Sequence, residues 1–268
     1  MNAKTKAGLN LLLFFVTIAV NALGAFGLIN GLSQKEVSDT FPTLLTPSPF
    51  TFSIWSVIYV LLLISLIYML VKSGDRETAR LIDQISVPFW ISSVANILWI
   101  VTFSFLWIGI STLLILILTI SLAVINRRLW APEGIGQKVN ALAFGLYNGW
   151  LIVATVVNVS AFLVQINWNR FGLGESVWGL IILIVALLLT SLIQTQLRNA
   201  ALTLPLAWAY FGIWQAHRAG GLYNGLYPNI EIATLIIGAL YVVIAVYVFI
   251  TNGNCVLPKG ASRKRSAA

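Results

Sequence analysis

The sequence predicts an all-α integral membrane protein with eight transmembrane helices, and its composition and its pattern of apolar stretches lead to that prediction. Of its 268 residues, 59% are hydrophobic and only 9% are charged, whereas soluble domains average about 45–50% apolar and about 25% charged residues. With a mean hydropathy of +0.92, the chain has too little polar surface for a soluble enzyme or a nucleic-acid-binding module. High hydrophobicity also excludes intrinsic disorder.

Eight apolar stretches supply the predicted helices, since about 20 apolar residues are needed to cross a hydrocarbon core of about 30 Å. We divide one run of about 42 residues near Gly109 because it is too long for a single span. The seventh stretch is short and contains Pro205. The stretches are Gly8–Leu32, Phe50–Val71, Ile85–Trp107, Gly109–Asn126, Val139–Gln165, Val177–Gln196, Ala200–Ala216 and Ile230–Ile250.

The basic residues predict the orientation of these helices. An even number of spans puts both termini on one side, and that side holds thirteen of the sixteen Lys and Arg residues: Lys4, Lys6, Lys72, Arg76, Arg80, Arg127, Arg128, Lys138, Arg198, Lys259, Arg263, Lys264 and Arg265. The other side holds Lys35, Arg170 and Arg218. Because cytoplasmic loops are enriched in Lys and Arg, we expect both termini in the cytoplasm. The net charge of +8 then reflects topology and attraction to lipid, with no nucleic-acid partner.

No Asp, Glu, Lys, Arg or His lies inside the predicted spans, and Glu231 lies only at the edge of the last one. Ion-coupled transporters, proton pumps and voltage sensors use intramembrane charges, so their absence argues against all three classes. The spans also lack the side chains that general acid–base catalysis and haem ligation require. The single Cys255 and single His217 form no disulfide or metal cluster. We therefore expect no cofactor, and an enzymatic role is disfavoured.

Tryptophan is abundant, with ten residues. Six of them lie at or near span ends, where an aromatic belt at the membrane interface explains them: Trp90, Trp107, Trp130, Trp168, Trp178 and Trp214. The other four, Trp55, Trp99, Trp150 and Trp208, lie within spans. A buried indole N–H needs a partner, so these four indicate polar neighbours or a cavity.

Helical spacing places three of these tryptophans on stripes with other aromatic and amide side chains. The stripes of the second and third spans and the asparagine of the fifth lie about 8–16 Å below the outer end of the spans, at 1.5 Å per residue. We predict a cavity that holds a flat apolar ligand; the alternative is packed aromatic rings with amides that bond neighbouring helices. The candidate ligand-binding residues are Trp55, Tyr59, Asn96, Trp99, Phe103, Tyr147, Trp150, Ala154 and Asn158.

The first outer loop, residues 33–49, is the longest external connection. Pro42, Pro47 and Pro49 stiffen it and keep it out of helix until Phe50. The loop is a candidate lid over the cavity, or it only joins two helices.

Three motifs in the second, third and fifth spans resemble those of the TspO/MBR family, the tryptophan-rich sensory and translocator proteins. The first is a proline-rich entry with a Trp and, four residues later, a Tyr (residues 47–59, PSPFTFSIWSVIY). The second is Asn96-Ile-Leu-Trp99 followed by Phe103. The third places Trp150 eight residues before Asn158, with Ala154-Thr155 between them.

The resemblance covers about residues 8–165 and implies a TspO-like five-helix bundle with three additional helices. It implies a five-helix unit over residues 1–168 and further helices over 169–252, before a basic tail, 253–268. Two features depart from the family pattern: Pro49 replaces a loop Trp, and Phe162-Leu163 replaces an aromatic–Arg pair. The resemblance implies tetrapyrrole (porphyrin) or sterol-like ligands and a homodimer, for which Gly24 and Gly27 offer close packing.

Three functions are compatible with these features. The first is a membrane protein that binds a flat hydrophobic ligand for sensing, sequestration or transport. The second is an ion-independent facilitator of a neutral solute, with Pro205, Gln194 and Gln196 in a kinked or polar-lined path. The third is porphyrin breakdown, which the resemblance links to Trp55 and Trp150 and which would need the ligand's own photochemistry.

Overall fold

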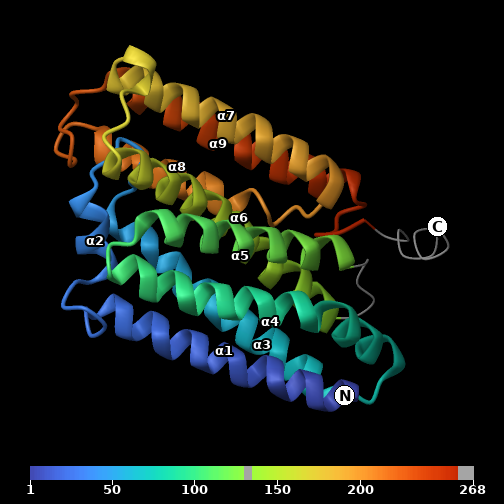
Figure 1. Ribbon diagram of the computed structural model, residues 1–268. Coiled ribbons are helices and arrows are strands. Elements are labelled where there is room, and N and C mark those ends of the chain that lie inside the picture. Colours follow the sequence, from blue (N-terminus) through green and yellow to red (C-terminus); the bar gives the residue numbers. More distant parts are fainter. Residues whose placement is uncertain (130–134, 259–268) are drawn as a thin grey trace.

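The computed structural model describes residues 1–129 and 135–258, with the side chains of residues 135 and 137 left undescribed. These residues form a bundle of nine α-helices and two short 3-10 helices (Figure 1). Trp130, Lys259, Arg263, Lys264 and Arg265 lie outside the described residues. The elements are α1 (Ala3–Ala25), α2 (Gln34–Thr40), η1 (Pro49–Ser53), α3 (Ile54–Val71), α4 (Arg76–Ser104), α5 (Ile108–Arg128), α6 (Ile135–Gln165), η2 (Arg170–Gly172), α7 (Glu175–Leu197), α8 (Leu204–His217) and α9 (Pro228–Thr251).

Seven helical segments of the described chain are long and apolar enough to cross a membrane. They correspond to seven of the eight predicted spans, and the division near Gly109 is confirmed by the break between Ser104 and Ile108.

Several helix ends differ from the apolar stretches. The helix α4 begins nine residues before the expected Ile85 because Asp75 caps it, accepting a hydrogen bond from the backbone N–H of Thr78 at 3.1 Å.

The remaining predicted span, Ala200–Ala216, is only partly helical. Within it α8 has 14 residues, or about 21 Å at 1.5 Å per residue, which is short of a bilayer core. The residues before it form a buried turn, in which the Asn199 side chain accepts a hydrogen bond from the N–H of Ala201 at 3.0 Å. Pro205 does not kink a helix here: it lies in the first turn of α8, where a missing N–H is harmless.

The first and last helices and the helix connections define two ends of the bundle. Figure 1 shows the start of α1 and the end of α9 at one end, here called the terminus end, and α2 with the longer connections at the other, the loop end. The helix α8 joins the two: Asn199, just before it, donates to the Ala141 carbonyl, and His217 at its last residue bonds the Leu44 carbonyl.

Burial is inverted relative to a soluble protein, as expected for a membrane protein. Large apolar side chains such as Leu188 (58% exposed) and Val243 (60% exposed) face outward, while Asn10, Asn126 and Asn148 are buried. One continuous buried cluster includes residues of α1 and of α3 through α9. The division into a five-helix unit and three further helices therefore does not coincide with separate cores, and it stays a prediction.

The glycines of α1 and the turn after it serve the chain's own fold. A Cβ at Gly24 would lie 2.7 Å from Cγ2 of Ile100, so this glycine lets α1 approach α4 closely. Gly27 lies in the turn after α1 with a φ of +71°, a conformation that suits glycine. Gly24 is thus used for close packing within one chain, and a homodimer stays a prediction.

The first outer loop contains an unexpected helix and is tied to α8. Ser33 and Glu36 form a capping box that starts α2. After α2, the Thr43 carbonyl accepts a hydrogen bond from the Tyr223 hydroxyl at 2.8 Å, and the Leu44 carbonyl bonds His217 Nε2 at 2.8 Å. The N–H of Ser48 donates to the Gly212 carbonyl at 3.0 Å. These bonds hold the loop against α8 and the connection that follows it.

Candidate functional site

Three aromatic rings from α3 and α6 converge on Trp55 of α3. Tyr59 stacks on Trp55 with ring centroids 5.1 Å apart and an angle of 25° between the planes. Tyr147 and Trp150 meet Trp55 edge-on, with centroids at 6.0 Å and 6.2 Å. The spacing-based prediction placed these residues on two separate helix stripes, and the fold brings the stripes into direct contact.

Two further aromatic residues, which sequence reasoning did not select, adjoin this group. Phe52 of η1 lies edge-on to Trp150 at 5.9 Å, and Phe14 of α1 lies edge-on to Tyr59 at 6.3 Å. Phe52 is part of the proline-rich motif, so its position could have been suspected. Phe14 has no motif around it, and only the packing of α1 on α3 places it here. We call Phe52, Trp55, Tyr59, Tyr147 and Trp150 the Trp55 cluster.

Asn96 connects the Trp55 cluster to two other helices. It is fully buried, accepts a hydrogen bond from Asn21 Nδ2 at 2.6 Å and donates to the Tyr147 hydroxyl at 3.1 Å. This chain links α1, α4 and α6 through neutral groups. Asn96 therefore orients the Tyr147 ring beside Trp55, and its amide is already engaged by the protein.

Asn158 organises a second group, away from Trp55. Its Oδ1 accepts from Trp99 Nε1 at 2.9 Å, and its Nδ2 donates to Ser111 Oγ at 3.0 Å and to Thr112 Oγ1 at 2.7 Å. Phe103 lies next to Trp99 with centroids 6.0 Å apart. These bonds join α4, α5 and α6, and Ser111 and Thr112 are polar residues that helical spacing did not single out.

The nine predicted site residues thus fall into two groups. The first comprises Trp55, Tyr59, Asn96, Tyr147 and Trp150; the second comprises Trp99, Phe103 and Asn158. Ala154 is partly buried and packs against the main apolar core.

Two polar atoms of the Trp55 cluster distinguish it from the second group. Trp150 Nε1 and the Tyr59 hydroxyl are buried and have no hydrogen-bond partner among the described residues. In the second group the Trp99 indole and the Asn158 amide are both partnered. Because a buried indole N–H or phenol usually finds a partner, these two atoms make the Trp55 cluster the stronger candidate for a ligand site.

Of the three prolines of the first outer loop, only Pro49 is linked to this cluster by the contacts described here. Pro49 begins η1, which carries Phe52 to Trp150. Pro47 is buried, and Pro42 lines a different hollow, between α6 and α7. The loop is held to α8, as described above, and its role as a lid stays a prediction.

The chemistry available at the Trp55 cluster is neutral. Its members offer aromatic faces, two indole N–H groups and two phenol hydroxyls, of which Trp150 Nε1 and the Tyr59 hydroxyl are buried without a partner among the described residues. Within residues 1–129 and 135–258, no group of three or more His, Cys, Asp or Glu side chains could hold a metal ion. The cluster is therefore suited to stacking against a flat ligand. It is also suited to hydrogen bonding with a ligand group that is uncharged or whose charge is delocalised.

Comparison with protein families agrees with this architecture. The family model described as TSPO-like protein matches residues 7–249. The match includes α7, α8 and α9, so the similarity extends well beyond residue 165, where the resemblance based on the three motifs ended. Searches of curated proteins and of solved structures each gave no match. Since the family model covers nearly all of the chain, this integral, multi-pass membrane protein belongs to the TSPO-like family.

Proposed function

We propose that this protein binds a flat hydrophobic ligand, of the tetrapyrrole or sterol class, at the Trp55 cluster. The observation that carries the proposal is a pair of buried polar atoms, Trp150 Nε1 and the Tyr59 hydroxyl, that have no partner in the described part of the chain and lie on rings that both contact Trp55. Leaving such atoms without partners costs free energy, so a ligand that pairs with them gains binding energy. The family assignment supports a hydrophobic ligand.

The proposed division of labour follows the hydrogen bonds. Trp55, Tyr59 and Trp150 contact the ligand through their ring faces and their free polar atoms. Asn96 acts as a positioning residue because its amide is used by Asn21 and Tyr147. In the second group, Asn158 positions α4 and α5 relative to α6. Ligand entry requires a shift of the Trp55 or Tyr59 side chain, both of which are only partly buried.

We also propose the orientation and role of the protein in its membrane. The terminus end carries nine of the twelve Lys and Arg residues within the described part of the chain, and the loop end carries Lys35, Arg170 and Arg218. The positive-inside rule then places both termini in the cytoplasm and the loop end outside. In this orientation the role is sensing, sequestration or transport of a lipid-soluble molecule, by one chain or by a homodimer.

Titration of the purified protein with protoporphyrin tests the ligand class. We expect saturable quenching of the tryptophan fluorescence, weakened in Trp150→Ala and largely retained in Trp107→Phe. The control suits this purpose because Trp107 is 56% exposed and lies outside the Trp55 cluster. Equal binding by a folded Trp150→Ala variant would show that the ligand does not use this site.

A second candidate function is facilitated passage of a neutral polar solute. It is favoured by a different set of buried atoms near the turn before α8. Both amide atoms of Asn148, the Thr203 hydroxyl and Gln194 Oε1 have no partner among the described residues. Saturable solute uptake into reconstituted vesicles without an ion gradient, reduced by Asn148→Leu, would favour this function over ligand binding.

A further inference from the structure

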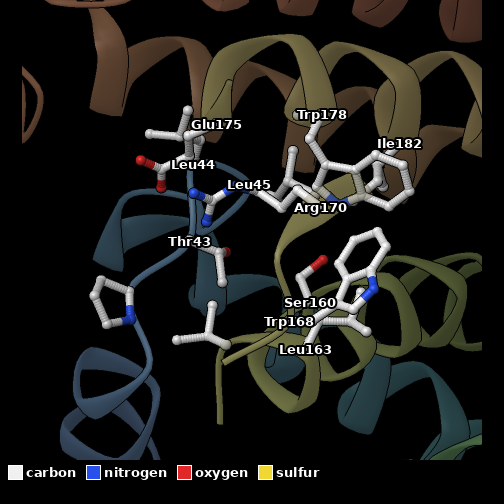
Figure 2. A pocket seen from close by; sticks show the side chains of 13 residues that line it. Thr43, Leu44, Leu45, Ser160, Leu163, Trp168, Arg170, Glu175, Trp178 and Ile182 are labelled. Atoms are coloured by element: carbon white, nitrogen blue, oxygen red, sulfur yellow. The ribbon is translucent and has the colours of Figure 1, made fainter. Parts of the chain in front are cut away.

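A hollow separate from the Trp55 cluster lies at the loop end of the bundle, between the end of α6 and the start of α7. It is a shallow hollow that opens to the outside, with a cavity volume of about 60 Å³. Figure 2 shows the loop residue Thr43 on one side and Trp168 and Trp178 on the other. This hollow is not part of the predicted site, and an aromatic belt alone would leave its charged rim unexplained.

The wall of the hollow is aromatic and aliphatic. Trp168 and Trp178 meet with ring centroids 4.6 Å apart at 68°, and Phe171 adjoins Trp168 at 5.0 Å. Leu163 of α6 and Ile182 of α7 add aliphatic lining. The helix α7 packs mainly against α9 and touches α6 over only a short stretch. The wall is therefore suited to contact with a hydrocarbon chain, or with the part of such a chain that lies nearest the opening of the hollow.

The rim of the hollow carries one positive and one negative side chain. Figure 2 shows Arg170 and Glu175 on the same side of the opening. Both are exposed. Within the described residues, Arg170 donates one long hydrogen bond, from Nε to the Leu173 carbonyl at 3.4 Å, and no carboxylate oxygen lies within 4.0 Å of its nitrogens. The guanidinium fork and the Glu175 carboxylate are thus both free to bind a ligand.

The backbone before α7 adopts an uncommon conformation to present this rim. Asn167, Arg170 and Phe171 have positive φ values of 51°, 55° and 55°. Asparagine tolerates this region, but Arg and Phe rarely occupy it. The result is a tight connection that carries Trp168 back against Trp178 and leaves Arg170 at the opening.

We propose that this hollow binds one zwitterionic phospholipid. The lipid phosphate pairs with the Arg170 guanidinium, whose fork matches phosphate oxygens. The lipid ammonium pairs with Glu175 and lies near the tryptophan rings, which attract cations. The upper acyl chain packs against Leu163 and Ile182. A purely anionic lipid satisfies Arg170 but leaves Glu175 without a cation, so the paired charges of the rim favour a zwitterion.

Native mass spectrometry of the purified full chain tests this proposal, with phosphatidylethanolamine and phosphatidylglycerol of identical acyl chains as probes. We expect one phosphatidylethanolamine to bind about tenfold more tightly than phosphatidylglycerol. Arg170→Gln should weaken phosphatidylethanolamine binding by about tenfold. Glu175→Gln should remove most of the difference between the two lipids.

The matched control is Arg218→Gln. Arg218 also lies at the loop end beside a tryptophan, with its guanidinium carbon 5.6 Å from the Trp214 ring centroid, but it does not line the hollow. This variant should keep the wild-type preference. Equal binding of both lipids by the wild type, or unchanged binding by Arg170→Gln, would overturn the proposal. Since Arg170 is exposed, this variant should fold; Trp178→Leu offers a second route, with weaker binding of both lipids expected.

Discussion

Replacing Trp150 by phenylalanine should weaken ligand binding while costing less stability than the same change at Trp99, because the Trp150 indole N–H has no partner among residues 1–129 and 135–258. The phenyl ring keeps an aromatic surface against Trp55 and Phe52. Trp99→Phe is the matched substitution: it removes the same atoms from a similarly buried ring, but its Nε1 donates to Asn158 Oδ1 at 2.9 Å.

The structure sets the expected magnitudes. Both variants lose the same apolar volume, so the transfer and cavity costs largely cancel in the comparison. Trp99→Phe also loses an interhelical hydrogen bond, which contributes roughly 0.6–1.7 kcal/mol in membrane proteins. Trp150→Phe loses no such bond. If the ligand accepts a hydrogen bond from Trp150 Nε1, its Kd should rise about two- to tenfold, corresponding to about 0.5–1.5 kcal/mol.

Two measurements on the same purified variants provide the assay. Unfolding in increasing denaturing detergent gives the stability of each variant, and quenching titrations with protoporphyrin give the affinity. We expect Trp99→Phe to be about 1 kcal/mol less stable than Trp150→Phe. We expect the larger rise in Kd for Trp150→Phe.

The reasoning is refuted if Trp150→Phe proves as destabilising as Trp99→Phe. That result would mean that Trp150 Nε1 has a structural partner, such as a buried water molecule, and is not free for a ligand. Unchanged porphyrin affinity in Trp150→Phe would separately remove the proposed hydrogen bond to the ligand.

Three other perturbations test how the loop and α8 are held. The Ser33 backbone and hydroxyl groups hold the pKa of Glu36 below its usual value. The capping box should therefore be intact above about pH 4.5, and α2 should loosen as the pH falls through the lowered pKa. Hydrogen exchange of the α2 amides, corrected for intrinsic rates, should show this loosening, and Glu36→Gln should reduce its pH dependence. His217→Phe removes the bond to the Leu44 carbonyl and should speed amide exchange in residues 42–48; unchanged exchange would contradict the proposed anchoring. Gly149→Ala places a Cβ against the backbone carbonyl of Leu202, just before α8, and should lower stability by about 1–3 kcal/mol. Gly8→Ala is the control: open space surrounds it and alanine favours helix, so this variant should not lower the temperature of thermal unfolding.

The membrane helices were predictable from the sequence because their main requirement is local. In lipid, a chain must satisfy its backbone hydrogen bonds internally, so a long apolar stretch with few charges forms a helix whatever lies beside it. Seven spans and the break near Gly109 follow from this rule. The rule fails at α8, where Asn199 and Pro205 start the helix late, since turn chemistry is not visible in an apolar count.

The candidate site was only partly predictable, because helical spacing shows which side chains share a face but not which neighbour that face meets. The stripes around Trp55 and Trp150 were found from spacing, and their contact is a product of packing. The partner of Asn96 is Asn21, 75 residues away. Whether an amide binds the protein or remains free for a ligand depends on such distant partners.

Composition and local pattern were thus sufficient to determine an apolar, helical membrane protein with its basic residues gathered at one end. Tertiary packing alone decided that the Asn158 amide is engaged while Trp150 Nε1 has no partner within the residues that the structure describes, and that Arg170 and Glu175 share the rim of one hollow. The physical reason is that helix formation in lipid is governed by each segment's own backbone, whereas hydrogen-bond satisfaction of a side chain depends on residues that only the folded chain brings near.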